Sequence, residues 1–140
     1  MNLLVPHDGS QNAAKALDHA VELAGKFPGS KINVVIVVAD LCLLSIGKDE
    51  CDALTGTLRK EAESIKQKIS DQLKARNISA EVMIQSGTEA ESILATADQI
   101  KADFIVIGAA GKHSGVGSGA LGSVANKVVN KSNRSVIVVK

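Results

Sequence analysis

The chain has 140 residues, a length typical of one domain with a sizeable core. Its 16 Lys and Arg nearly balance its 15 Asp and Glu, and both of its aromatic residues are Phe. Nucleic-acid-binding domains usually show a basic excess or stacking aromatic side chains, so the composition argues against that class. The longest apolar run, 34–39, is too short to cross a bilayer, and the N-terminus lacks the pattern of a signal peptide. We therefore expect one soluble cytoplasmic domain over residues 1–140, with neither a membrane nor a nucleic acid as partner.

The first part of the chain predicts two strands separated by a helix. Residues 2–5 form a short apolar run that Pro6 ends, as expected for a buried strand. Ser10 is suited to cap a helix that ends near Lys26, with an apolar stripe of Ala13, Leu17, Ala20, Val21 and Ala24. Residues 32–39 are almost all Val and Ile. An uninterrupted apolar strand is typical of a parallel sheet that helices cover on both faces.

The middle of the chain predicts a loop, a long helix and a third strand. Residues 40–52 are expected to form the loop, and the helix begins at Ala53 with Leu54, Leu58, Ile65, Ile69 and Leu73 facing inward. The loop contains the two cysteines, Cys42 and Cys51. They are too few and too widely spaced for a disulfide framework or a zinc site, so we expect two reduced thiols. Residues 79–85 alternate in the manner of a strand.

The last part of the chain predicts two more helices and two more strands. Thr88–Glu91 matches a capping box that opens a helix, with Ala90, Ile93, Leu94 and Ala97 facing inward. Strands are expected at 103–107 and 135–139. The helix between them has an apolar stripe formed by Leu121, Val124, Ala125, Val128 and Val129.

Strands and helices alternate throughout, which predicts a Rossmann-like α/β fold. The simplest arrangement is a five-stranded parallel sheet in the order 3-2-1-4-5, with helices on both faces. Ligands of such sheets bind at the carboxyl ends of the strands, where the winding reverses. That point lies between strands one and four, which are followed by Pro6-His7-Asp8 and by a glycine-rich loop. The reversal point is therefore the expected binding site.

The glycine-rich loop, Gly108 to Ser123, contains six of the twelve glycines. Glycine allows close backbone approach, and the start of the following helix offers unpaired N–H groups to an anion. After Asp103 the chain has no acidic residue, so no nearby carboxylate in sequence would repel a phosphate. Residues 117–122 fit G-x-G-x-x-G, but they lie well past the strand and no acid follows, which argues against a dinucleotide site. The loop is predicted to bind nucleotide phosphates.

These motifs resemble the universal stress protein family along the whole chain. VPHDGS follows the first strand, and Gly108-x-x-Gly111 with Gly122-Ser123 follows the fourth. Nucleotide-binding members have nine residues between the two halves of the second motif, whereas this chain has ten. The resemblance implies an adenine nucleotide alpha hydrolase-like fold and a nucleotide site that includes the Pro6 turn.

The resemblance also assigns roles to individual positions. Asp8 would accept hydrogen bonds from ribose hydroxyls, and Val38 would pack on the base. The backbone of Ile107 and Gly108 would approach adenine and ribose. The phosphates would be surrounded by Gly111, Lys112, His113, Gly122, Ser123 and Val124. His7 is assigned no role, because that position varies in the family.

The resemblance thus implies a dimeric regulatory protein of the stress response that binds ATP with Mg²⁺. The resemblance implies that Ser135–Val139 is the dimer strand, and this is physically sensible because an apolar edge strand would otherwise be exposed. No evident general base is placed to activate water, so turnover is expected to be slow or absent. Two alternatives stay open, namely a dimeric adaptor that has lost nucleotide binding and a slow ATPase. The preferred nucleotide, whether AMP, ADP, ATP or a cyclic form, also stays open.

Overall fold

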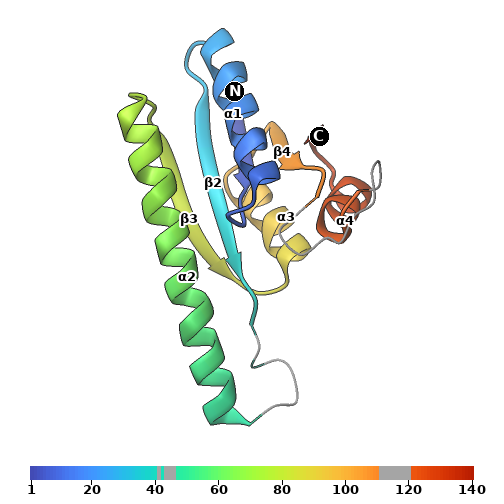
Figure 1. Ribbon diagram of the computed structural model, residues 1–140. Coiled ribbons are helices and arrows are strands. Elements are labelled where there is room, and N and C mark those ends of the chain that lie inside the picture. The colour runs from blue at the N-terminus through green and yellow to red at the C-terminus, as the bar shows by residue number, and fades with distance from the viewer. Residues whose placement is uncertain (41, 43–46, 111–120) are drawn as a thin grey trace.

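The computed structural model describes residues 1–40, 42, 47–110 and 121–140. Within them, strands and helices alternate as the sequence predicts (Figure 1). In chain order the elements are β1 (Asn2–Pro6), α1 (Gln11–Lys26), β2 (Lys31–Val38), α2 (Lys48–Ala75), β3 (Ala80–Ser86), α3 (Glu89–Gln99), β4 (Phe104–Gly108), α4 (Ser123–Lys131) and β5 (Ser135–Val139). All strand pairs are parallel, in the order β3-β2-β1-β4-β5, which confirms the predicted sheet.

The helices cover both faces of the sheet. Leu3 and Val5 of β1 pack with α1 and α2, whereas Leu4 of the same strand packs with α3 and α4. Successive side chains of a strand point to opposite faces, so a strand between two helical layers must be apolar at every position. This explains the uninterrupted apolar run of β2. None of the helices in the described ranges is long and apolar enough to cross a membrane.

The helix starts were predicted with mixed success. Ser10 caps α1 as expected, since its Oγ accepts a hydrogen bond of 3.1 Å from the N–H of Ala13. Thr88 holds the N-cap position of α3, but its side chain makes no capping hydrogen bond. The capping box therefore predicted the position of the helix start and was wrong about the side-chain contact.

The prediction that residues 40–52 form a loop was wrong at its C-terminal end. Helix α2 begins at Lys48, and its N-terminal half projects past the end of the sheet (Figure 1). Ile69 and Leu73 near the other end are buried, but Leu54 on the projecting half is 50% exposed. A helical stripe packs only where a sheet lies beneath it, so the inward assignment of Leu54 was also wrong.

The apolar stripe expected around α4 was wrong at two positions. Ala125 and Val128 are buried against the sheet, as predicted. Val129 is 39% exposed on the outer side of the helix, and Leu121, which precedes the helix, is 37% exposed. The inward face of α4 is thus narrower than the run of apolar residues suggests.

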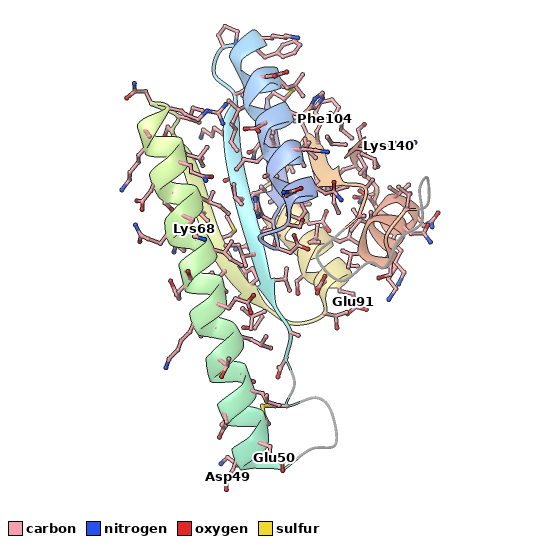
Figure 2. The ribbon with its side chains drawn as sticks, viewed as in Figure 1. Asp49, Glu50, Lys68, Glu91, Phe104 and Lys140 are labelled. Carbon is pink, nitrogen blue, oxygen red and sulfur yellow. A yellow bond between two sulfur atoms is a disulfide. The ribbon has the colours of Figure 1, made fainter. Side chains whose placement is uncertain are left out.

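The expectation of two reduced thiols is contradicted by a disulfide between Cys42 and Cys51 (Figure 2). Their Cα atoms lie 5.2 Å apart, within the range that a disulfide spans. The early start of α2 causes this proximity, because it places Cys51 in the first turn of the helix, where its N–H donates to the carbonyl of Gly47. The bond ties the segment that follows β2 to the projecting end of α2, close to the exposed Asp49 and Glu50 at its tip.

Gly108 lets α1 approach the carboxyl end of β4. A Cβ atom at Gly108 would lie 2.8 Å from the carbonyl oxygen of Asn12 and 2.9 Å from its carbonyl carbon. Both neighbours are backbone atoms of the first turn of α1, which cannot move without displacing the helix. Glycine is therefore required here for packing, whatever the role of its backbone in binding.

We predict that Gly108→Ala lowers the free energy of unfolding by about 1–3 kcal/mol, the usual cost of overpacking. Gly25→Ala is the matched control, since a Cβ there meets nothing within 4 Å and the position lies inside α1. The control should be neutral or stabilising by up to about 1 kcal/mol. Urea unfolding of both variants measures this difference, and a Gly108→Ala variant as stable as the wild type would disprove the close approach.

Candidate functional site

Strands β1 and β4 separate at their carboxyl ends. Their ladder pairs Leu3 with Phe104 and Leu4 with Ile105. In contrast, pairing between β1 and β2 continues to Pro6 and Val35. β1 therefore pairs with β2 over more residues than with β4, and the sheet opens on the β4 side.

Pro6 explains on which side the sheet opens. The N–H of His7 donates to the carbonyl of Val35 in β2 over 2.9 Å. Alternate residues of a strand direct their backbone groups to opposite sides, so Pro6 is turned toward β4. Consistent with this, the carbonyl of Asn2 accepts from the N–H of Asp103, just before β4. Because proline has no N–H, it cannot donate the next ladder bond to β4.

The turn between β1 and α1 is held by contacts between side chains and backbone. The N–H of Gly9 donates to Nδ1 of His7 over 3.0 Å, and the N–H of Ser10 donates to Oδ1 of Asp8 over 3.0 Å. Gly9 has a φ of 84°, which favours glycine, and a Cβ there would lie 3.1 Å from Cδ1 of Ile65 in α2. Asp8 is thus half-buried in a tightly specified turn at the edge where the sheet opens.

The two ends of the glycine-rich loop lie together at the end of β4. The N–H of Gly122 donates to the carbonyl of Ala109 over 2.7 Å, and the N–H of Ala109 donates to the carbonyl of Val139 over 2.8 Å. Gly111, Lys112 and His113, which were predicted to contact phosphate, lie outside the described residues. The loop therefore leaves the sheet and returns to it at the same place.

Helix α4 begins at this place, and no side chain of the described residues caps it. Its N-cap residue is Gly122, and its first turn has no acidic residue. Ser123 is exposed at the first helical position, and Val124 is half-buried. The N–H groups of a first helical turn have no partner within the helix and carry a partial positive charge. This end of α4 favours an anion.

The remaining predicted residues lie at the same edge, but their side chains are buried in the core. Val38 lies three residues beyond Val35, the partner of Pro6, and is 3% exposed among residues of α1 and α2. Ile107 is 5% exposed and packs on the opposite face. The turn of Asp8 and the start of α4 thus lie at the same edge of the sheet, after β1 and β4 respectively, whereas Val38 and Ile107 offer mainly backbone to this edge.

Sequence reasoning missed His7, which is 8% exposed and supports the turn. Burial lowers the pKa of its imidazole from the ordinary value of 6.5, because desolvation disfavours the charged form; the negative charge of Asp8 opposes this to a smaller extent. A polar residue between Pro6 and Asp8 at the end of a buried strand was the available signal.

The described residues include one group of side chains with metal-ligating chemistry, Cys42, Cys51 and Asp52. Two of these three are joined in the disulfide. Metal binding by cysteine needs the thiolate, which a disulfide lacks. The group therefore does not act as a metal site in this state.

Comparison with known proteins agrees with the fold and the motifs. The family model described as the universal stress protein family matches residues 1–140. The universal stress protein YxiE of Bacillus subtilis is 30% identical over 146 aligned positions, which cover 99% of this chain and 97% of that protein. The solved structure of universal stress protein UspA from Lactobacillus plantarum has a TM-score of 0.86 at 27% identity, covering 100% of this chain and 97% of that one.

Two further similar structures hold adenine nucleotides. One is a universal stress protein in complex with cAMP, with a TM-score of 0.73 at 26% identity, covering 100% of this chain and 97% of that one. The other is the universal stress protein from Archaeoglobus fulgidus in complex with dAMP, with a TM-score of 0.68 at 25% identity, covering 100% of this chain and 98% of that one. Motifs, sheet order and whole-length similarity agree, and the chain belongs to the universal stress protein family.

Proposed function

We propose that this chain binds ATP with Mg²⁺ where β1 and β4 separate. The observation that carries the proposal is that two features lie at the same edge of the sheet. One is the turn that contains Asp8, and the other is the start of α4, whose N-cap residue has no side chain. A carboxylate suits ribose hydroxyls, and a helix N-terminus suits phosphate. The cAMP and dAMP complexes of related proteins support an adenine nucleotide.

The described residues suit the nucleotide in charge and chemistry. Asp8 would hold the ribose, while the first-turn N–H groups of α4 and the hydroxyl of Ser123 would hold phosphate, together with Gly111, Lys112 and His113. Mg²⁺ would accompany the triphosphate, since this ion is usually held through substrate phosphates and water. Val38, Ile107 and Gly108 would bound the base and ribose through their backbone.

The proposed role is regulatory binding in the stress response with slow or absent turnover. His7 lies at this edge, but its Nδ1 already accepts the N–H of Gly9 and its side chain is buried. It is therefore poorly placed to take a proton from an attacking water. A bound nucleotide would instead select one arrangement of the surrounding segments. A cytoplasmic location stays a prediction, and the Cys42–Cys51 disulfide weighs against it, because the cytosol usually keeps thiols reduced.

The proposal includes a homodimer through β5, which lies at one edge of the sheet. The carbonyl of Val139 points to β4, since it accepts from Ala109. Because backbone direction alternates, the N–H groups of Val136 and Val138 point away from the sheet. An apolar strand with outward donors pairs readily with a second copy.

We predict that Asp8→Asn weakens ATP binding by about tenfold or more, because it removes a charged acceptor. The amide oxygen of Asn can still accept the N–H of Ser10, so the turn should survive. With 2′,3′-dideoxy-ATP, which lacks the ribose hydroxyls, the loss should shrink below about twofold. Calorimetric titration of both ligands gives the comparison.

Asp49→Asn is the matched control, because Asp49 is an exposed carboxylate at the far tip of α2 (Figure 2). It should bind ATP as the wild type does. An equal loss for both ligands in Asp8→Asn would show that Asp8 does not act through the ribose. No binding of ATP to the wild type would reject the proposed function.

We predict that Val138→Pro abolishes the dimer. Proline removes the outward N–H at this position without removing a ladder bond to β4. Val138→Ala, which keeps that N–H, should remain dimeric. Light scattering coupled to size-exclusion chromatography measures the mass, and circular dichroism checks the fold. A wild-type chain that stays monomeric at high concentration, or a dimeric Val138→Pro variant, would contradict the proposed interface.

One observation favours a second candidate, an adaptor of the same fold that no longer binds nucleotide. Ten residues separate Gly111 from Gly122, one more than the spacing that the resemblance gives for nucleotide-binding members of the family. If the extra residue has destroyed the phosphate register, deleting Gly117 should create or improve ATP affinity. If the chain binds ATP as proposed, the deletion should weaken binding. Titration of the deletion variant beside the wild type decides between the two.

A further inference from the structure

We propose that His7 is a positioning residue for nucleotide binding: its neutral imidazole holds the turn that presents Asp8, and its protonation weakens binding. This inference rests on the proposed nucleotide site. His7 would contact the turn that contains Asp8, and not the ligand itself.

The contact between His7 and Gly9 requires one protonation state. Nδ1 of His7 accepts the Gly9 N–H over 3.0 Å, and a ring nitrogen that accepts carries no proton. The imidazole is therefore neutral, with its proton on Nε2. Protonation would add a hydrogen to Nδ1, so that the N–H of Nδ1 would face the N–H of Gly9. The hydrogen bond between them would then be lost.

Loss of the hydrogen bond between Gly9 and His7 would change the position of Asp8, because the turn is held at both of its ends. On one side the N–H of His7 is held by Val35 of β2, and on the other the Oγ of Ser10 caps α1. Only Asp8 and Gly9 lie between these anchors. A change at the Gly9 amide must therefore alter the backbone next to Asp8, whose Oδ1 accepts from Ser10.

Within the described residues, the charged groups near His7 come from its own turn and from α2. Asp8 is the charged group that acts on the imidazole within the described residues, and it favours the charged form. Beneath the turn, α2 presents Ile65 to Gly9, with Glu61 one helical turn earlier, while β2 presents the carbonyl of Val35. Burial outweighs Asp8 and lowers the pKa of His7.

The sign of the pH effect follows from this lowered pKa. The unfolded chain takes up the proton at a higher pH than the folded one. The stability that neutral His7 contributes is therefore complete above the unfolded value of 6.5 and is lost as the pH falls through the folded pKa. Nucleotide affinity should decline in the same acidic range.

The experiment measures adenosine binding at a pH of about 7.5 and about 5.5, the range in which histidine titrates. Adenosine has no phosphate that titrates in this range, so its affinity reports on the Asp8 end of the site. Acidification through the lowered pKa of His7 should weaken wild-type binding by up to about fivefold, the equivalent of one hydrogen bond. Circular dichroism at both pH values confirms that the chain stays folded.

Three variants separate the positioning role from other effects. His7→Asn supplies an amide oxygen that can accept the Gly9 N–H and does not titrate, so its affinity should be high and independent of pH. His7→Leu lacks an acceptor and should bind about fivefold more weakly at both pH values. His19→Gln, at an exposed position of α1, should behave as the wild type does.

A second measurement needs no nucleotide. In the ligand-free protein, the nuclear magnetic resonance signal of the Gly9 amide should shift with the same midpoint as the His7 ring. A Gly9 signal that ignores the titration of His7 would overturn the proposal. So would a His7→Asn variant that loses affinity in acid as the wild type does, or wild-type affinity that rises in acid. Absence of adenosine and ATP binding at both pH values would overturn the proposed function as well, whereas binding that is indifferent to pH would overturn only the role of His7.

Discussion

The structure depends on how its central strand ends. β1 lies between β2 and β4, and Leu3, Leu4 and Val5 are fully buried beneath helices on both faces. Backbone groups in such a position must be paired within the protein, because water cannot reach them. The sheet can open at low cost only where a donor is already missing. Pro6 supplies that position, and it is turned toward β4. The opening therefore lies where the winding of the sheet reverses.

Two helices begin beside this opening, and their N-termini are treated differently. α1 is capped by Ser10 and continues the turn that contains Asp8. α4 starts at Gly122, which has no side chain to cap it. The close approach of α1 to Gly108 keeps both helix starts at the same edge. Ser10 thus caps α1 through its side chain, whereas the N-cap residue of α4 cannot do so, and such a helix start favours an anion. This asymmetry underlies the proposed orientation of the nucleotide, with ribose at Asp8 and phosphate at α4.

Family membership and local geometry support the function at different levels. Similarity over the whole length establishes the universal stress protein family, and related proteins have been solved with cAMP and dAMP. The hydrogen bonds around Asp8 concern this chain alone, and they connect the proposed ribose contact to the protonation state of His7. The family resemblance assigns His7 no role. The role proposed for His7 follows from the direction of one backbone N–H.

The sequence by itself determined the sheet order and the location of the candidate site. Its signals were local: apolar runs, the Ser10 cap and the glycine-rich segment each describe their own part of the chain. Such signals could not place features that depend on distant segments. Leu54 lies on a regular apolar stripe, yet only the extent of the sheet decides that it is exposed. Cys42 and Cys51 meet because of where α2 begins, and His7 acts through the fold of a turn. Tertiary structure decided these points, because burial and hydrogen-bond direction depend on the path of the backbone in space.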